Sequence, residues 1–452
     1  MFYKFRNSFL LISKFLCFLV NLGIFLLLFS INNDFLLRPS RTTAITILAF
    51  AFIYGLMTRV YGNLDIGTKK SKPIIYSLTL CLAAADLAAH LFLCIMNITI
   101  VHDGHFVYEQ PWLLILVLVL QLIATSLMTY GGNYLFFQFI PPQKCLMICH
   151  KDDNIQKLKK SIASYRKQYN ICRVVDYRQS NLLSLIDEHE CIFLCNLTVT
   201  ERNNIVEYCY AQRKHIYYTF EMADFVSLGA HRTMFGDTSV MHSPPKGLTM
   251  EQRVIKRAFD IFISALMLIL LSPVFAVTAL AIKLEDGGHV FYKQKRATYA
   301  GRVFHVIKFR SMKEENSVNV SVTKDDDRIT KVGKFIRKFR IDELPQLINV
   351  LKSDMTLVGP RPEMMENVEK YTCELPEFSY RLWAKAGITG MAQIYGKYNT
   401  SPKEKLALDL AYIEQYSLLL DLRLLLRTVL VFFTPDESTE AFEAEEVEEL
   451  CL

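Results

Sequence analysis

Two adjacent carboxylates, Asp342 and Glu343, are the residues of this sequence best suited to chemistry. They follow a basic stretch, 334–340, and precede Pro345, which suits the first turn of a helix because it has no N–H to donate. We therefore expect a helix to begin at Asp342–Glu343 and to continue to Leu351. This would place both carboxylates at a helix N-terminus, where the dipole favours negative charge and free N–H groups bind anions.

Like charges side by side are usually separated or neutralised by a cation. A divalent metal on one carboxylate, with the other left as a nucleophile, fits phosphoryl transfer. An ordinary acidic turn after a basic helix would contain the same two residues, and this segment alone favours that simpler interpretation. The rest of the chain reverses the preference.

Further candidates for anion binding flank the acid pair. Lys308 and Arg310 lie two residues apart on a predicted strand, 303–309, so both would face one side and could bind a single anion. Arg361 stands in a rigid Gly-Pro-Arg-Pro turn that presents one guanidinium. Asp325 and Asp327 match the DxD metal motif of nucleotide-sugar glycosyltransferases, but they fall in a polar loop and are not favoured.

The composition indicates a membrane protein with more than one domain. The chain has 452 residues, 52% of them hydrophobic, and a net charge of +6, with basic residues concentrated in 251–340. A basic surface beside apolar segments suggests anionic lipids or phosphorylated substrates. The eleven cysteines show no CxxC pair or Cys/His ligand spacing, so neither a zinc site nor a disulfide framework is predicted.

Four apolar segments near the N-terminus each approach the roughly 20 residues that a membrane-spanning helix needs. They cover residues 10–30, 44–60, 75–97 and 112–135. The connection 59–74 contains four basic residues and 98–111 contains none, so the positive-inside rule places both ends of this bundle in the cytoplasm. Asp86 lies within the third segment, where a charge is costly and we expect a neutralised or interface-facing carboxylate.

The next region alternates short apolar strands with helices, which predicts a parallel, Rossmann-like sheet. Its strands are expected at 145–149, 171–177, 191–197 and 215–220. The turn after the first strand contains no glycine, so close backbone approach to a nucleotide phosphate is not expected. We therefore predict a structural or regulatory domain.

A second long apolar run, 258–284, is interrupted by Ser272 and Pro273. A membrane-spanning helix here would place the basic segment that follows on the outer face, against the positive-inside bias. A re-entrant helix that turns at Ser272-Pro273 and returns to the same face avoids this conflict. The predicted fold class is thus membrane α plus α/β: a four-helix transmembrane bundle, a Rossmann-like α/β domain, and a mixed α/β catalytic domain with a re-entrant membrane helix.

The predicted domains follow from these patterns. They are the bundle at 1–140, the Rossmann-like domain at 141–235, a linker at 236–252, the catalytic domain at 253–435 with its re-entrant helix at 258–284, and an acidic tail at 436–452.

Taken together, the motifs of the last domain resemble the bacterial sugar transferases, the polyprenyl-phosphate hexose-1-phosphate transferases. The matching stretches are KRAFD, LLSPVF, YKQKR, KFRSM, ITKVGKFIRK, IDELPQLINVLKSDMTLVGPRPE, AGITGMAQI and LDLAYIEQYS. The four preceding apolar segments and the Rossmann-like domain resemble the large monotopic subgroup of these phosphoglycosyl transferases.

The resemblance implies transfer of a sugar-1-phosphate from a UDP-sugar to undecaprenyl phosphate, with release of UMP. It implies that Asp342 is the nucleophile, that Glu343 helps hold Mg²⁺ beside it, and that Arg337 binds phosphate. Arg361 is implied to contact the nucleotide-sugar, and Asp409 falls at an acidic position near the site. The family also implies location in the bacterial inner membrane with a cytoplasmic catalytic face, contact with membrane lipids, no nucleic acid, and leaves a homodimer open.

The sequence departs from the family pattern at several positions. Thr298 replaces a glycine, Ala386 a proline and Met391 the usual tryptophan, while Lys397 stands where arginine is common. Met391 and Lys397 fall in the segment expected to recognise sugar or uridine, so the departures affect substrate identity more than reaction type. Of the two, Lys397 is included among the substrate-binding candidates. A DxD-type glycosyltransferase and a non-catalytic membrane scaffold or regulator are the alternatives.

Overall fold

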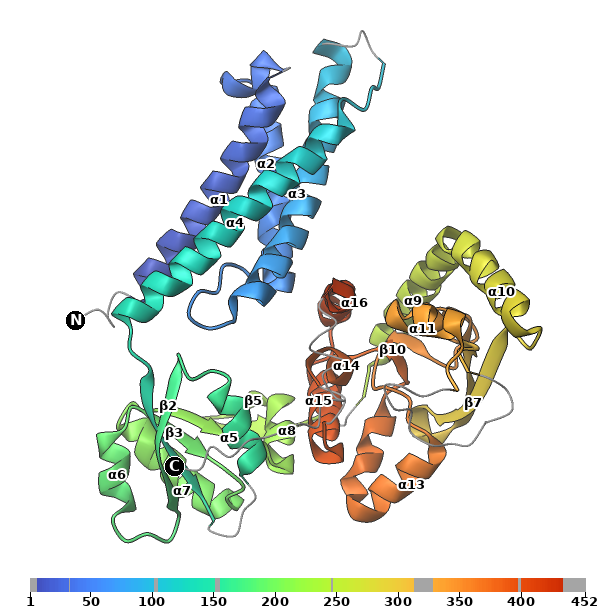
Figure 1. The fold of residues 1–452 in the computed structure, drawn as a ribbon. Coiled ribbons are helices and arrows are strands. Elements are labelled where there is room, and N and C mark those ends of the chain that lie inside the picture. Colours follow the sequence, from blue (N-terminus) through green and yellow to red (C-terminus); the bar gives the residue numbers. More distant parts are fainter. Residues whose placement is uncertain are drawn as a thin grey trace. The chain divides into compact units, whose positions relative to one another are not determined.

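The computed structural model describes residues 6–31, 33–100, 105–150, 155–244, 247–312, 328–396 and 400–433. The chain forms two compact units that divide between Glu221 and Met222 (Figure 1). Part of the predicted 141–235 domain therefore lies in the second unit, and the predicted domain limits stay predictions.

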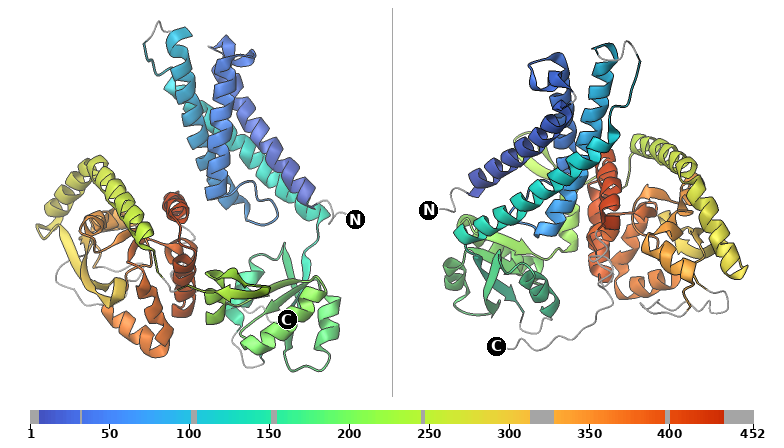
Figure 2. Two further views of the ribbon diagram at one scale, coloured as in Figure 1. Left: turned by 180° about the vertical axis from the view of Figure 1, so that it is seen from behind. Right: turned by 45° about the horizontal axis from the view of Figure 1, so that its top comes forward.

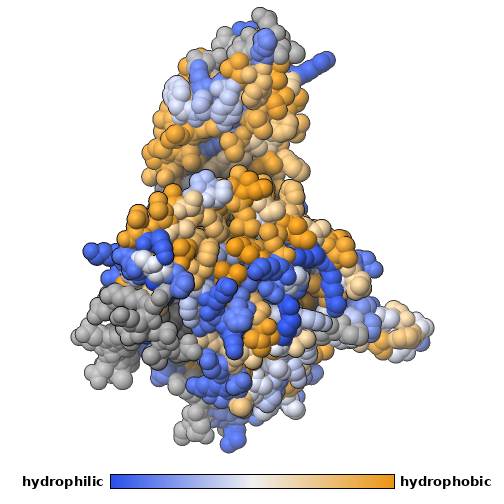
Figure 3. All heavy atoms as spheres, turned by 90° about the vertical axis from the view of Figure 1, so that its right-hand side faces the viewer, coloured by the Kyte–Doolittle hydropathy of each residue, from blue (hydrophilic) through white to orange (hydrophobic). Residues whose placement is uncertain are grey.

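The first unit begins with four long helices, which confirms the four apolar segments. They are α1 (Arg6–Ser30), α2 (Arg41–Tyr61), α3 (Ser71–Ile100) and α4 (Pro111–Phe139), with a short 3₁₀ turn, η2 (Asp34–Leu37), after α1. All four are long and apolar enough to cross a membrane. Ser40 caps α2 by accepting a hydrogen bond from the Thr43 N–H, and Pro111 occupies the start of α4. Their exterior is largely apolar, as the upper part of Figure 3 shows.

Several polar side chains of these helices are buried, among them Asn21, Asp86 and Gln121. Asp86 is 2% exposed, and its Oδ1 accepts a hydrogen bond of 3.1 Å from the Gln121 amide. The same amide donates to the Asn21 carbonyl at 3.1 Å. The carboxyl group therefore has an interior partner, as expected for an acidic residue in an apolar helix.

A parallel four-stranded sheet follows the helices, which confirms the predicted strand and helix alternation. The strands are β1 (Gln143–Cys149), β2 (Tyr169–Asp176), β3 (Cys191–Leu194) and β4 (His215–Tyr218), in the order β2-β1-β3-β4. The connecting helices are α5 (Gln156–Ala163), α6 (Leu182–Glu188) and α7 (Val199–Ala211). The central strands β1 and β3 are buried on both faces, so the segment Cys-Leu-Met-Ile-Cys is apolar throughout. Leu146 and Ile148 face α6 and α7, whereas Cys145 and Met147 pack with Ile162 of α5.

The second unit begins with α8 (Met222–Leu228) and an exposed antiparallel hairpin of β5 (His231–Phe235) and β6 (Thr238–His242). Two helices then form a pair bent by 60°, α9 (Met250–Leu270) and α10 (Ser272–Asp286) (Figures 1 and 2). The bend falls at the predicted break. Because Pro273 cannot continue the α9 hydrogen-bond ladder, the Ser272 hydroxyl donates instead to the Ile269 carbonyl at 2.8 Å.

The remaining elements surround the end of this bent pair. They are the antiparallel strands β7 (Phe291–Ala297) and β8 (Val303–Phe309) joined through η3 (Tyr299–Gly301), α11 (Lys331–Lys338), η5 (Ile341–Glu343), α12 (Gln346–Leu351), β9 (Thr356–Val358), α13 (Met365–Glu374), η6 (Pro376–Trp383), β10 (Gly387–Thr389), α14 (Met391–Tyr395), α15 (Pro402–Glu414) and α16 (Leu418–Phe433). Strands β7 and β8 form a hairpin around Ala300-Gly301. Its turn contains Ala300 and Gly301 at φ of 55° and 75°, a region that glycine adopts without strain.

A buried ion pair connects α9 and α16 to β9, the strand that leads into the Gly-Pro-Arg-Pro turn. Lys256 Nζ lies 2.5 Å from Asp421 Oδ2 and donates to the Val358 carbonyl at 3.0 Å. The Tyr412 hydroxyl lies 2.8 Å from the other Asp421 oxygen. Asp260 accepts hydrogen bonds from the Thr356 hydroxyl and the Leu357 N–H, at 2.6 and 3.1 Å. Polar groups of three helices thus fix the position of a three-residue strand.

We predict that Asp421→Asn lowers the free energy of unfolding of the full-length protein by about 3 kcal/mol, because it leaves the Lys256 ammonium buried without a counter-charge. Denaturant unfolding in detergent would measure the change. Arg302→Gln is the matched control, since Arg302 forms an exposed ion pair with Asp354 and its loss should cost less than about 1 kcal/mol. Equal effects in the two variants would contradict the role assigned to the buried pair.

Candidate active site

The acid pair lies in a 3₁₀ turn of its own, η5, between α11 and α12. This differs from the predicted helix start, because α12 begins only at Gln346 after Pro345. Arg340, which lies between α11 and η5, has the left-handed conformation with φ of 52° and so redirects the chain into η5. Asp342 and Glu343 are thereby separated from both helices and are half-buried.

Glu343 is held by two cations from distant parts of the chain. Its Oε1 lies 2.8 Å from Lys308 Nζ of β8 and 3.2 Å from Arg361 Nη2, which follows β9. Although burial opposes ionisation, Lys308 and Arg361 together hold the pKa of the Glu343 carboxyl well below its ordinary value. Glu343 is therefore a fixed negative charge.

Asp342 has the opposite environment. It forms no hydrogen bond or ion pair with the residues that the structure describes. Burial and the neighbouring Glu343 charge raise the pKa of the Asp342 carboxyl, against the opposing charges of Lys308 and Arg337. Glu343 is thus neutralised by Lys308 and Arg361, whereas the oxygens of Asp342 have no partner among the described residues.

Arg337 is close enough for its charge to act on Asp342, and one of its own donors is unused. Its Nη1 is buried and has no hydrogen-bond partner in the described part of the chain. A buried guanidinium nitrogen without an acceptor is costly unless a ligand supplies one. The position of Arg337 is therefore compatible with an anion placed next to Asp342.

Arg361 is positioned by close contacts between two short strands. The Gly359 N–H donates to the Thr389 carbonyl at 2.8 Å, and the Gly387 N–H donates to the Pro360 carbonyl at 2.9 Å. A Cβ on Gly359 would lie 2.3 Å from the Lys385 carbonyl oxygen, so only glycine permits this approach. The turn after β9 is thus rigid, as its sequence predicts.

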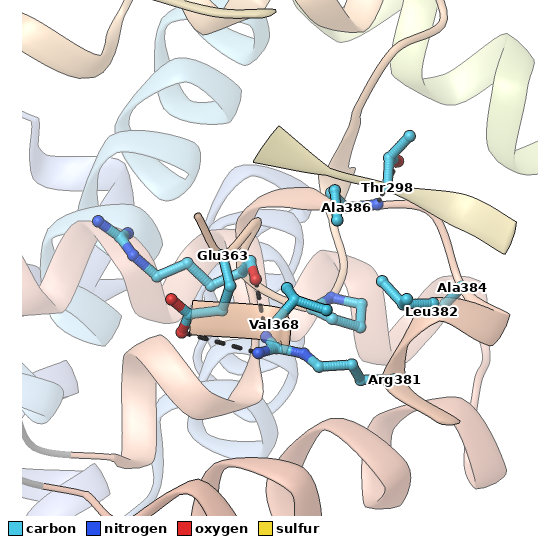
Figure 4. A pocket seen from close by; sticks show the side chains of 10 residues that line it. Thr298, Glu363, Val368, Arg381, Leu382, Ala384 and Ala386 are labelled. Atoms are coloured by element: carbon cyan, nitrogen blue, oxygen red, sulfur yellow. Dashed lines mark hydrogen bonds and ion pairs between the residues drawn. The ribbon is translucent and has the colours of Figure 1, made fainter. Parts of the chain in front are cut away.

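A second group of charged residues, Arg381, Asp409 and Glu363, supports the backbone of this turn. Arg381 is 3% exposed, and its Nη2 donates to the Arg361 carbonyl at 2.7 Å. The same guanidinium lies 2.9 Å from Asp409 and 3.6 Å from Glu363, the latter contact visible in Figure 4. Burial raises the pKa of Asp409 to about 6, although Arg381 opposes this shift. Asp409 thus contacts Arg381 and connects to Arg361 only through it.

A small pocket adjoins the acid pair. Its lining includes Arg296, Lys308, Glu343, Gln346 and Arg361. Arg296 is the third cation of this lining, with Lys308 and Arg361, and it donates to the Pro362 carbonyl at 3.2 Å. Sequence reasoning assigned it no role, although it belongs to the YKQKR motif.

The other predicted binding residues lie elsewhere. Arg310 is 7% exposed and forms an ion pair with Asp286 at the end of α10, so it does not join Lys308 at the acid pair. Its role in substrate binding stays a prediction. Lys397, Asp325 and Asp327 lie outside the described residues.

Two departures from the family pattern contact each other. The Ala386 N–H donates to the Thr298 hydroxyl at 3.1 Å, and that hydroxyl donates to the Asp354 carbonyl, also at 3.1 Å. Figure 4 shows Thr298 and Ala386 side by side at one wall of a pocket. A proline at 386 would have no N–H, and a glycine at 298 would have no acceptor, so these two residues form one compensating pair.

Comparison with known proteins covers this second unit. The family model described as "Bacterial sugar transferase" matches residues 251–435. A UDP-glucose:undecaprenyl-phosphate glucose-1-phosphate transferase of Caulobacter vibrioides is 38% identical over 190 residues, which are 40% of this chain and 71% of that protein. A protein of the same name from Escherichia coli is 42% identical over 184 residues, 39% of this chain and 40% of that protein.

A third relative has a different sugar in its name. The UDP-N-acetylgalactosamine-undecaprenyl-phosphate N-acetylgalactosaminephosphotransferase of Aeromonas hydrophila is 40% identical over 185 residues, 40% of this chain and 44% of that protein. The acid pair, its cations and these relatives define an enzyme of the phosphoglycosyl transferase class. The chain belongs to the bacterial sugar transferase family.

We predict opposite effects on stability at the two acids. At pH 8, Asp342→Asn should raise the free energy of unfolding by about 1 kcal/mol, because it removes a half-buried charge that Glu343 repels. Glu343→Gln should lower it by about 2 kcal/mol, because it weakens the ion pairs of Lys308 and Arg361. Denaturant unfolding of both variants measures the difference.

The effect at Asp342 should depend on pH. Because the pKa of Asp342 is raised in the folded protein, the cost of its charge is present above that pKa and disappears as the pH falls toward its ordinary value. The gain in Asp342→Asn should therefore shrink between pH 8 and pH 4. A loss of stability in Asp342→Asn at pH 8 would contradict the environment described for this carboxyl.

Proposed function

We propose that the protein transfers a hexose-1-phosphate from a UDP-sugar to undecaprenyl phosphate and releases UMP, the first membrane step in the synthesis of an exopolysaccharide, capsule or O-antigen. The observation that carries this proposal is the asymmetry of the acid pair: Glu343 is bound by two cations, while Asp342 beside it has no hydrogen-bond partner among the described residues. The names of the relatives support the class of both substrates.

In the first step, a carboxylate oxygen of Asp342 attacks the phosphorus that carries the sugar. A bond forms between Asp342 and that phosphorus, the bond to the UMP oxygen breaks, and UMP leaves with the electron pair. Arg337 and Arg361 offset the negative charge that develops on the phosphoryl oxygens. The result is a covalent aspartyl-phosphosugar.

In the second step, a phosphate oxygen of undecaprenyl phosphate attacks the same phosphorus. The bond to Asp342 breaks, the carboxylate is restored, and the lipid-linked diphosphosugar leaves. The nucleophile splits one transfer between two weakly reactive phosphates into two easier displacements.

The acid pair also fits Mg²⁺. Both side chains offer carboxylate oxygens, which are the ligands that this ion prefers, and Mg²⁺ is commonly held by one or two carboxylates together with substrate phosphates. The described residues contain no group of three or more His, Cys, Asp or Glu side chains that could hold a metal without substrate. Glu343 would hold the ion with help from Asp342, and when bound it would supply additional charge neutralisation at the phosphates.

The bent pair α9–α10 supports a membrane-embedded site. Its outer face is apolar, with Phe262, Ile269 and Val277 all more than 60% exposed. The far end of α10 packs next to the acid pair, because Ile282 shares a core with Ile341 of η5. We propose that α9–α10 is the re-entrant helix and that the catalytic unit lies on the cytoplasmic face of the inner membrane, where the lipid phosphate is accessible.

A membrane glycosyltransferase that uses Asp325 and Asp327 would release UDP instead of UMP. A scaffold or regulator would release neither nucleotide. Analysis of nucleotide products with UDP-galactose, UDP-glucose and UDP-N-acetylhexosamines therefore separates the three functions and identifies the sugar.

We predict that Asp342→Asn abolishes covalent labelling by a UDP-sugar carrying radioactive β-phosphate and lowers UMP release by roughly 10³-fold or more, because the amide cannot act as the nucleophile. Gel separation after acid quench measures the label, and a coupled assay measures UMP. Asp354→Asn is a matched control, since this acid lies in the same unit and pairs with the exposed Arg302. Full turnover in Asp342→Asn would refute the assignment.

The re-entrant helix predicts that both ends of the bent pair lie on one side of the membrane. Cysteines introduced at the exposed positions Glu251 and Lys295 should react with a membrane-impermeant maleimide only in inverted vesicles, in a background without the native exposed Cys172 and Cys373. Ser272 lies at the break between them and should be protected. Labelling of the Lys295 position from the periplasm would show a spanning helix instead.

A further inference from the structure

A small cavity lies within the first unit, where the apolar helices meet the parallel sheet. Its volume is about 70 Å³. The lining residues that matter here are Arg6 at the start of α1, Phe136 and Phe137 near the end of α4, Thr68, and Lys167 before β2.

Arg6 and Lys167 line this cavity, Lys70 lies two residues after its lining residue Thr68, and each of these three cations lies over an aromatic ring. Arg6 is 6.0 Å from the ring centre of Phe136, Lys167 is 5.8 Å from that of Phe137, and Lys70 is 6.0 Å from that of Tyr165. Such contacts orient a cation without neutralising its charge.

None of the three cations forms an ion pair with a carboxylate of the described chain. Two other lysines of this unit, Lys14 and Lys69, do form ion pairs: both contact Asp65, at 3.0 and 2.8 Å. The carboxylate of Asp65 is thus paired with these two lysines. A concentration of unneutralised positive charge around a cavity favours an anionic ligand.

The surroundings of the cavity favour an anion with apolar chains. The last two turns of α4, next to the cavity, carry exposed apolar side chains: Tyr134, Leu135 and Phe139 are 66%, 44% and 52% exposed. Leu11, on the second turn of α1, is 70% exposed. Because α1 and α4 are apolar enough to cross a membrane, these side chains would contact lipid acyl chains beside the cavity, which favours a ligand whose phosphate is joined to such chains over a free phosphate.

We propose that this cavity binds the phosphate of an acidic phospholipid such as phosphatidylglycerol. Arg6 and Lys167 bind the phosphate oxygens, and the acyl chains lie along the end of α4. Because Lys167 belongs to the sheet domain and Arg6 to the helices, the lipid joins the two parts of this unit. The proposal concerns residues outside the catalytic unit and does not depend on the transferase mechanism.

The test is phosphatidylglycerol binding to the full-length protein in phosphatidylcholine nanodiscs, measured by native mass spectrometry across increasing phosphatidylglycerol content. Arg6→Gln with Lys167→Gln should weaken binding about five-fold for each cation, roughly 25-fold for both. Lys159→Gln with Lys160→Gln is the matched control, because it removes two exposed lysines of α5 that do not line the cavity. The control should bind as the unaltered protein does.

Three outcomes would overturn the proposal. Equal weakening in both double variants would show nonspecific attraction to a basic domain. Tight competition by soluble glycerol phosphate would show a site for a free anion. Failure of the charge-preserving pair Arg6→Lys and Lys167→Arg to retain binding, while its unfolding in pure phosphatidylcholine is normal, would show that charge at the cavity is not what binds the lipid.

Discussion

The carboxylate of Glu343 is the constraint on which the arrangement of the catalytic unit depends. Its ion pairs with Lys308 and Arg361 connect β8, η5 and the turn after β9, three segments that the sequence separates by up to 53 residues. None of these segments is long, and none could hold its position by its own hydrogen bonds. The same charge that assembles the site also raises the cost of ionising Asp342.

Two layers of charge support this arrangement. The upper layer contains the acid pair with Lys308, Arg337 and Arg361. In the lower layer, Arg381 donates to the Arg361 carbonyl and lies against the carboxylates of Asp409 and Glu363. Because the lower groups are buried and paired, they fix the backbone that presents the upper ones. The cations of the upper layer are partly uncompensated, which suits a site whose ligands carry several phosphate charges.

Much of the fold follows from local sequence. The apolar lengths predict four helices, the strand and helix alternation predicts a parallel sheet, and Ser272-Pro273 predicts the bend. The arrangement of the site is harder to predict from local sequence, because its contacts join side chains that are distant in the chain. For example, the spacing of Lys308 and Arg310 predicts that both bind one anion. In the structure, Arg310 instead forms an ion pair with Asp286. Likewise, no local pattern indicates that Arg381 supports Arg361 or that Arg340 adopts a left-handed conformation.

The contact between Thr298 and Ala386 has an evolutionary consequence. Reverting either position alone toward the family residue would remove one half of a buried hydrogen bond and leave the other half unsatisfied, whereas changing both together would remove donor and acceptor at once. The two sites are therefore epistatic: the effect on stability of a change at one position depends on which residue stands at the other.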